Sequence, residues 1–184
     1  MSTSIVTSEV AEPYARALLS LTQDSGTTDA VNGTAGELLE LLSGSEELTD
    51  FLANPLTSAD AKKGVIKQLL GDSANHSFLN FLQLLVDRGR AAVMVPILNQ
   101  YRALVRDLNQ TVLAEVSSAV ELSDAQKDSI RQRVVSMTDA KAVELSTEID
   151  KSLLGGVIIK VGSQVVDASL RGQLRRIGIQ LGSA

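Results

Sequence analysis

The sequence predicts an α+β protein in which a six-helix bundle precedes a smaller mixed domain of element order β-α-β-β-β-α. Three observations lead to this prediction. Apolar residues recur at helical spacing from residue 8 to residue 109, and the spacing then changes to the alternation of a half-buried strand. Aromatic residues make up only 3% of the chain, so the core has to consist of Leu, Val, Ile and Ala, which suits close helix packing. We therefore expect two domains, 1–109 and 110–184.

The first expected helix carries an apolar stripe, and Pro13 lies early in it, where a missing backbone N–H is tolerated. The stripe follows the spacing i, i+3, i+4, i+7: Tyr14, Ala17, Leu18 and Leu21. A second helix is expected at about 28–43, with Gly33 and Gly36 weakening its start.

Turn and capping residues delimit the next two helices. A third helix at about 45–53 should end before Asn54-Pro55, because the residue before proline avoids the helical conformation. Either Ser58 or Thr57 can cap the fourth helix, since a hydroxyl oxygen at this position accepts a hydrogen bond from the first turn.

Two further helices complete the expected bundle. The fifth, about 75–88, should end with Gly89 as its C-terminal cap. His76 lies at its start, where a surface or capping role is expected. The sixth helix covers about 92–109, and short turns joining six helices make a compact bundle.

Alternating segments and a capping pair define the first part of the second domain. In 112–122 one face is apolar: Val112, Ala114, Val116, Val120 and Leu122. Ser123 with Gln126 forms a capping box that opens a helix. Residues 143–150 alternate again, with Val143, Leu145, Thr147 and Ile149 on one face.

The last part combines a hairpin and a helix. An apolar run, 157–161, is joined to 164–166 by Gly162-Ser163, and a two-residue loop that begins with glycine fits a type II′ hairpin turn. Ser169 is expected to cap a final amphipathic helix.

Composition excludes several classes of protein. The chain has no cysteine and a single histidine, so disulfide scaffolds, thiolate metal sites and zinc sites are not expected. No run of 18 apolar residues and no signal-peptide pattern is present, which favours a cytosolic product. Net charge is −5, and residues 1–50 hold nine acids and one base, Arg16. This acidic region is a solvated surface or a binding surface for a basic amphipathic helix.

Candidate catalytic and nucleic-acid sites are weak. Gly155-Gly156 lies between two expected strands, not in the strand-to-helix setting of a phosphate loop, and is read as a bulge or a close backbone approach. Asp150 and Asp167 could be paired acids of a hydrolase, but no second motif supports them. An RNA-binding sheet would need exposed aromatic residues, and the expected strands contain none.

Several segments nevertheless resemble one family along nearly the whole chain. The stretch IDKSLLGGVIIKVGSQVVDASLRGQLRRI at 149–177 is similar to the signature of the delta, or oligomycin-sensitivity-conferring, subunit of F-type ATP synthases. EPYARAL at 12–18, FLANPL at 51–56 and LLVDRGR at 84–90 follow the same family pattern in the same order.

The resemblance implies a stator subunit that links the catalytic head to the peripheral stalk and stops the head from turning with the rotor. It implies no catalytic residue, cofactor, metal, nucleic acid or direct lipid insertion. The expected partners are N-terminal segments of the alpha subunits in the alpha/beta hexamer and the b-type stalk subunits. The missing transit sequence suggests a bacterial or cyanobacterial type, on the cytoplasmic or stromal-side face of a plasma or thylakoid membrane.

The resemblance also implies where the partners bind. The first and fifth helices of the N-terminal domain should face the alpha subunit, with these expected contacts: Tyr14, Leu18, Phe78, Leu82 and Leu85. The C-terminal domain should bind the stalk, and its candidate residues, some of which only hold the fold, are Gly155, Gly156, Asp167, Ser169, Leu170, Arg171 and Leu174.

Overall fold

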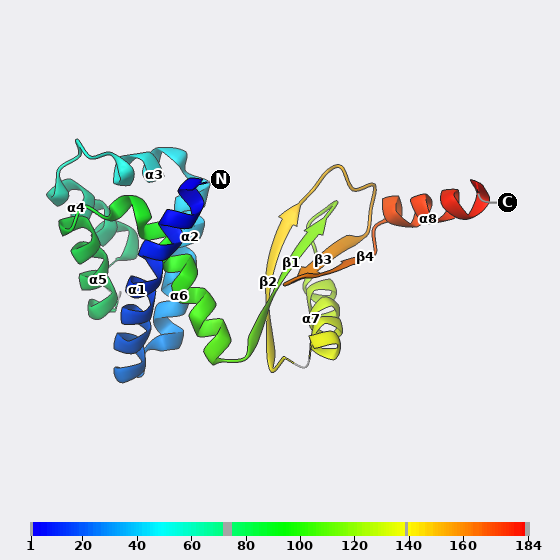
Figure 1. The fold of residues 1–184 in the computed structure, drawn as a ribbon, viewed down its shortest axis with the longest axis horizontal. Helices are drawn as coiled ribbons and strands as arrows, with labels where there is room; N and C mark the ends of the chain where they lie inside the picture. The colour runs from blue at the N-terminus through cyan, green and yellow to red at the C-terminus, as the bar shows by residue number, and fades with distance from the viewer. Residues whose placement is uncertain (1, 72–74, 139, 183–184) are drawn as a thin grey trace. The chain divides into compact units, whose positions relative to one another are not determined.

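The computed structural model describes residues 2–71, 75–138 and 140–182, and the chain divides into two compact units, Met1–Val105 and Arg106–Ala184. The boundary between the units lies a few residues before the change of apolar spacing at 109–112. Helices make up the first unit, and a sheet with two helices makes up the second (Figure 1). An α+β architecture is therefore confirmed.

Helices of the first unit follow one another with short turns. Their bounds are α1 Ser2–Asp24, α2 Thr28–Gly44, α3 Glu46–Ala53, α4 Ala59–Leu70, α5 His76–Asp87, the 3₁₀ turn η1 Ala91–Val93 and α6 Met94–Leu108. One continuous core joins them, and its largest fully buried side chains include Tyr101, Phe78, Leu18, Leu38 and Ile66. Tyr101 of α6 donates its hydroxyl to the Thr28 carbonyl (3.3 Å) and lies 3.3 Å from the Thr22 hydroxyl. Burial raises the pKa of this phenol.

At the N-termini of α3, α4 and α5, a side chain accepts a hydrogen bond from a backbone N–H of the first turn. Ser45 accepts a hydrogen bond from the Leu48 N–H, and Ser58 accepts one from Ala61. The cap of α4 is thus Ser58, which decides between the two hydroxyls that the sequence offered. At α5 the cap is Asn75, whose Oδ1 accepts two backbone N–H groups, while His76 is the exposed first residue of the helix.

The buried face of α1 differs from the expected stripe. The row of α1 residues in the core is Ala11, Ala15, Leu18 and Thr22. Leu18 was expected to share its face with Ala17 and Leu21, yet Ala17 is exposed and Leu21 is 41% exposed. Small side chains let a helix approach its neighbours closely, so packing density selects the alanine row over the more hydrophobic one.

Proline and glycine occupy unexpected places in α1 and α2. Because α1 begins at Ser2, Pro13 lies inside the helix and not early in it, and removes one backbone hydrogen bond there. Gly36 is buried within α2, where an added Cβ would lie 3.3 Å from the Arg102 guanidinium carbon. The glycine therefore makes room for a side chain of α6, which outweighs its low helix propensity.

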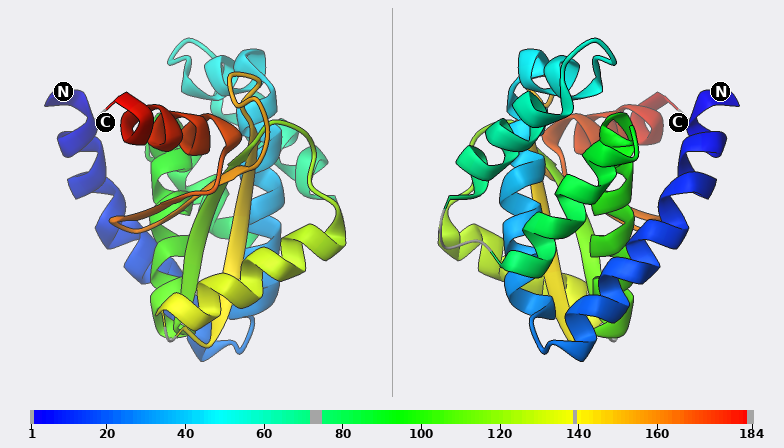
Figure 2. Two further views of the ribbon diagram at one scale, coloured as in Figure 1. Left: turned by 90° about the vertical axis from the view of Figure 1, so that its right-hand side faces the viewer. Right: turned by 90° about the vertical axis from the view of Figure 1, so that its left-hand side faces the viewer.

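The second unit contains a four-stranded mixed sheet of order β2-β1-β3-β4. Its elements are β1 Thr111–Ser118, α7 Asp124–Thr138, β2 Ala142–Ile149, β3 Val157–Val161, β4 Gln164–Asp167 and α8 Leu170–Gly182. This order is the β-α-β-β-β-α expected from the sequence. Strands β1 and β2 are parallel, and the other pairs are antiparallel. Helix α7 covers one face of the sheet (Figure 2), around the buried residues Ala114, Val116, Leu122, Ile130, Val134 and Ile159.

Strand β1 ends earlier than its apolar pattern suggests. Pairing stops at Ser118, whose hydroxyl donates to the Val120 carbonyl (2.7 Å) in a turn. Val120 is 70% exposed, whereas Leu122 reaches the core from the loop. Two later members of the alternating β2 pattern, Thr147 and Ile149, are also exposed. Alternation fixes which face a residue takes, but not whether that face is covered along the whole strand.

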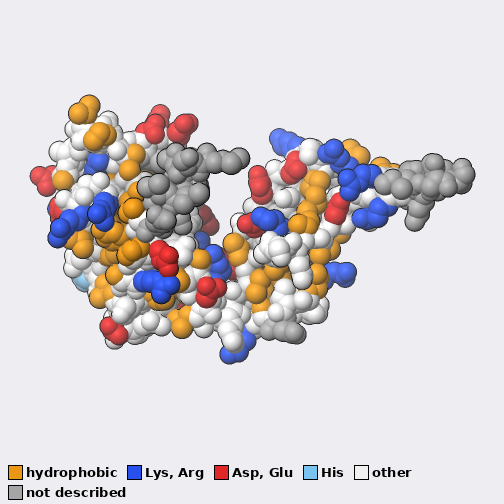
Figure 3. All heavy atoms as spheres, in the orientation of Figure 1, with side chains coloured by type: hydrophobic (Ala, Val, Ile, Leu, Met, Phe, Trp, Pro, Cys, Tyr) orange, Lys and Arg blue, Asp and Glu red, His pale blue; other side chains and the backbone are white. Residues whose placement is uncertain are grey.

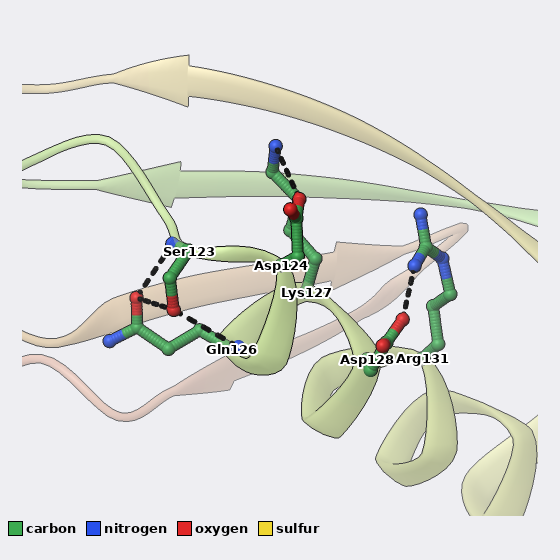
Figure 4. A network of polar contacts seen from close by, with 6 residues as sticks. All are labelled: Ser123, Asp124, Gln126, Lys127, Asp128 and Arg131. Atoms are coloured by element: carbon green, nitrogen blue, oxygen red, sulfur yellow. Dashed lines mark hydrogen bonds and ion pairs between the residues drawn. The ribbon is translucent and has the colours of Figure 1, made fainter.

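Two local motifs of this unit are confirmed. At the start of α7, the Ser123 N–H donates to Gln126 Oε1 (2.9 Å), and the Gln126 N–H donates to Ser123 Oγ (3.4 Å), which is the capping box seen in Figure 4. The hairpin between β3 and β4 turns at Gly162, whose φ of +57° is a conformation that favours glycine.

Substitutions of two leucines on α5, one buried and one exposed, test which residues form the core of the first unit. Leu82 is 0% exposed and Leu84 is 46% exposed. We expect Leu82→Ala to lower the free energy of unfolding by about 2–5 kcal/mol, because it removes buried methyl groups and leaves a cavity. Leu84→Ala should change it by about 0.5 kcal/mol or less. Urea unfolding followed by circular dichroism measures both, and equal losses would contradict the core described for this unit.

Candidate partner-binding surfaces

Asp150 and Asp167, the two acids that could pair in a hydrolase, accept local hydrogen bonds. The Ser152 side chain and the Ser152 N–H, which donates to Asp150 Oδ1 (2.8 Å), lower the pKa of Asp150. Asp167 Oδ1 likewise accepts a backbone N–H two residues later, that of Ser169, just before α8. Among the described residues, no group of three His, Asp or Glu side chains is placed to hold a metal ion. None of the helices in the described part of the chain is sufficiently long and apolar to cross a membrane.

Two backbone hydrogen bonds fix the junction between the sheet and α8. The Ala168 N–H donates to the Val157 carbonyl (3.0 Å), and the Leu170 N–H donates to the Gly155 carbonyl (2.9 Å). Gly156 lies between these acceptors with φ +77°, and an added Cβ would lie 2.4 Å from the Ala168 carbonyl oxygen. The glycine pair is therefore a close approach of two backbones, as the sequence suggested.

A series of hydrogen bonds among polar groups then stabilises the start of α8. Asp167 Oδ1 accepts the Ser169 N–H (2.9 Å) and the Ser169 hydroxyl (2.6 Å), and Ser169 Oγ accepts the Gly172 N–H (3.0 Å). The hydrogen bonds from Ser169 lower the pKa of Asp167, with smaller contributions from Arg176 and Arg175. Gly172 is part of this arrangement, because a Cβ there would lie 2.3 Å from Asp167 Oδ2.

Helix α8 presents apolar and cationic side chains outward. Leu170 is 47% exposed, Leu174 is 60% exposed, and Arg171 is exposed beside them. Of the seven residues expected in the stalk-binding domain, Gly155, Gly156, Asp167 and Ser169 hold this junction. The other three, Leu170, Arg171 and Leu174, have the exposure that a docking surface needs.

The expected head-binding residues are distributed differently. Leu18, Phe78, Leu82 and Leu85 are each 0% exposed and belong to the core, whereas Tyr14 keeps part of its surface. The four buried residues offer no surface to a partner in this chain. Their assignment as direct contacts is therefore corrected: they support α1 and α5 from the inside of the unit.

A different set of residues forms the outer surface of α1 and α5. Val10 (36% exposed), Tyr14 and Leu21 (41%) recur along α1 beside the buried row, and Leu84 (46%) is exposed on α5. Tyr14 accepts a hydrogen bond from Arg90 Nη1, and the Arg90 guanidinium carbon lies 4.9 Å from the Tyr14 ring centroid. Since Arg90 follows α5, this contact places the Tyr14 side of α1 toward the end of α5.

Sequence reasoning did not find the roles of Arg90 and Gly172. Arg90 lies in the LLVDRGR segment at 84–90, where Gly89 has φ +67° and the Arg90 N–H donates to the Leu85 carbonyl (2.7 Å). An arginine after a glycine cap gives no sign of a partner 76 positions away. Gly172 could have been noticed as a helix-weakening residue in the first turn, which calls for a packing reason.

The glycine junction leads to a comparison of two substitutions. Gly156 and Gly162 both have positive φ, but an added Cβ meets the Ala168 backbone only at Gly156. Gly162→Ala should therefore cost about 1–2 kcal/mol of unfolding free energy from backbone strain. We expect Gly156→Ala to cost more and to disturb the amide resonances of Ser169 and Leu170. Equal costs, with unchanged α8 resonances, would contradict the close approach.

The Asp167 carboxylate makes the start of α8 sensitive to acid. Its pKa is lowered in the folded chain, so its contribution is present above the pKa of the unfolded chain and is lost as pH falls through the folded value. We expect the Ser169 and Gly172 amide resonances to move together below about pH 4. In Asp167→Asn this acid transition should be absent, and its persistence would show that another group is responsible.

Comparisons with known proteins agree with the sequence resemblance. Residues 10–181 match the family model described as ATP synthase delta (OSCP) subunit. The chain is 51% identical over 181 residues to ATP synthase subunit delta of Microcystis aeruginosa, covering 98% of this chain and all of the relative. It is 51% identical over 178 residues to the same subunit of Trichodesmium erythraeum, covering 97% and 98% of the two chains.

A solved structure shows the same fold. A chain in the cryo-EM structure of the Toxoplasma gondii mitochondrial ATP synthase hexamer superposes with a TM-score of 0.69, covering 93% of this chain and 96% of that chain at 21% identity. The family match spans most of the sequence, and both relatives are matched along nearly their full length. The chain belongs to the ATP synthase delta (OSCP) subunit family and is a non-catalytic peripheral-stalk component of F-type ATP synthase.

Proposed function

We propose that this chain joins the two ends of the stator through one surface on each unit. The first unit, as a six-helix bundle, binds N-terminal helical segments of the alpha subunits in the alpha/beta hexamer. The second unit binds the b-type stalk subunits through α8. Held in this way, the head is prevented from rotating with the rotor. The complex would place the chain at the cytoplasmic or stromal-side face of a plasma or thylakoid membrane, without lipid contact of its own.

The observation that carries this proposal is a pair of exposed apolar helix surfaces on separate units. On α1, Val10, Tyr14 and Leu21 lie beside a row of buried residues, so a partner helix can contact them without disturbing the core. On α8, Leu170 and Leu174 are four positions apart, which places them on one helix face. Exposed apolar anchors at helical spacing are typical of surfaces that accept an amphipathic helix.

Two attachments suit a joint that must resist torque. When both units are engaged, release of one leaves its partner tethered, and rebinding becomes an intramolecular event at a high effective concentration. Long residence can therefore arise from two moderate interfaces, each dominated by a few buried anchors.

The open face of the sheet argues against the alternative of RNA binding. A groove lies along the strands on this face, and Glu115 and Glu148 are among the residues that line it. Lys160, also in the lining, forms an ion pair with Glu115 (2.7 Å). Carboxylates on the face would repel phosphates, and the strands offer no aromatic side chain for base stacking.

Two surface substitutions test the two attachments independently. Leu21→Asp should weaken binding of an alpha N-terminal peptide about tenfold or more, because a charge replaces an apolar anchor, and should leave b-type stalk binding unchanged. Leu174→Asp should do the reverse. Isothermal titration calorimetry with both partners measures the four affinities, and circular dichroism checks the fold. If either substitution abolished both interactions in a folded chain, the assignment of one partner to each unit would fail.

A further inference from the structure

The topology of the second unit brings four strand ends together. Ser118, the last residue of β1, pairs with Ile149 at the end of β2 and with Val157 at the start of β3. Ile158 pairs with Asp167, the last residue of β4. One end of the sheet therefore carries the 119–122 loop, the 150–156 loop and the start of α8. We call the exposed apolar residues of these loops and of the end of β2 the sheet-end patch: Val120, Ile149 and Leu154.

Large apolar side chains are unusually exposed in this patch. Leu154 is 72% exposed, Val120 is 70% exposed and Ile149 is 56% exposed. Single exposed apolar residues are normal on protein surfaces, but several gathered at one place indicate an interaction site. Figure 3 shows hydrophobic and basic side chains next to each other where α8 leaves the sheet.

Backbone contacts connect the patch to the exposed face of α8. The Asp150 N–H donates to the Ser118 carbonyl (2.9 Å), which holds the 150–156 loop against the end of β1. The Leu170 N–H donates to the Gly155 carbonyl, the residue next to Leu154. The 150–156 loop is thus held against both the end of β1 and the start of α8, which brings the patch near enough to the Leu170–Leu174 face for one partner to cover both.

The charges around α8 indicate the chemistry of that partner. Arg171, Arg175 and Arg176 are exposed, and residues 168–184 contain no acid. Arg171 acts electrostatically on Asp150, and Arg175 and Arg176 act on Asp167, but each carboxylate is held mainly by its hydrogen bonds from Ser152 or Ser169. Within the described residues, these three arginines form no ion pair. Their guanidinium groups therefore remain available for carboxylates of a bound protein, which suits their planar, bidentate geometry.

We propose that the stalk-binding surface extends beyond α8 onto the sheet-end patch, and that its occupant is an acidic amphipathic helix end. Apolar anchors of that helix cover Val120, Ile149 and Leu154 together with Leu174, and its carboxylates pair with the α8 arginines. The inference rests on the proposed attachment of the second unit to the b-type stalk. It adds three residues that were not among the expected stalk contacts, and it defines the sign of the charge that the partner carries.

The apolar part is tested with matched substitutions in the full-length chain. The probe is the recombinant extramembrane segment of the b-type subunit from the same genome, measured by calorimetry. Val120→Asp and Leu154→Asp should each weaken binding about tenfold or more, because they place a charge among covered apolar anchors. Met137→Asp is the control: Met137 is 42% exposed, and lies at the end of α7 that leads back to the start of β2. It should change the affinity less than about twofold.

The electrostatic part is tested by charge reversal. Arg175→Glu should weaken binding and reduce its dependence on salt concentration, because an attraction between opposite charges is screened by ions. Arg133→Glu, an exposed arginine on α7, should change neither quantity. An acid-to-lysine change in the b-type segment that restores binding to Arg175→Glu would support the assigned pairing. Unchanged circular dichroism spectra and melting temperatures show that the variants are folded.

Three results would overturn the inference in distinguishable ways. If Val120→Asp and Leu154→Asp bind as well as the unaltered chain while Leu174→Asp does not bind, the stalk docks on α8 alone, and the proposed function stands without this extension. If Arg175→Glu binds at least as tightly as the unaltered chain, the partner is not acidic. If the unaltered chain does not bind the b-type segment, the proposed stalk attachment fails together with the inference.

Discussion

The close backbone approach between residues 155–157 and 168–170 is the constraint on which the placement of α8 depends. Two backbone hydrogen bonds cross this junction, and it tolerates no side chain at Gly156, where a Cβ would lie 2.4 Å from a carbonyl oxygen. Hydrogen bonds of this kind contribute about 0.5–1.5 kcal/mol each. Because α8 exposes both Leu170 and Leu174, its direction is set mainly by this junction and by the Asp167–Ser169 cap. A rigid start leaves the apolar face of the helix available to a partner.

In the first unit, side-chain packing holds a helix in place while leaving apolar residues of that helix exposed. Ala11, Ala15 and Leu18 anchor α1 in the core, and Val10, Tyr14 and Leu21 stay on the outside. The contact from Arg90 to Tyr14 then links the outer side of α1 to the segment after α5. A helix that is buried along one row can offer the adjacent row without loss of stability. The residues that we propose bind a partner and the core residues are thus neighbours in sequence but different in role.

Local features of the fold could be predicted from the sequence, because their causes are local. The capping box at Ser123, the hydroxyl cap of α4 (expected at Ser58 or Thr57 and found at Ser58) and the glycine turn at Gly162 each depend on residues a few positions apart. Burial could not be predicted equally well. Leu18 and Leu21 have the same side chain, and only the position of the neighbouring helices makes one a core residue and the other a surface residue. Sequence reasoning about partner contacts therefore selected the most apolar residues, most of which are internal.

The family signature also separates the framework of a binding site from its contact surface. Gly155, Gly156, Asp167 and Ser169 belong to the family-like stretch at 149–177, and in the structure they hold the backbone at the base of α8. These residues fix where a contact surface begins. Affinity arises from apolar side chains that become buried on binding, and those are outside the glycine and capping positions. The same stretch therefore contains residues that shape the base of α8 and exposed residues such as Leu154, which lies in a loop and which we propose contacts the partner.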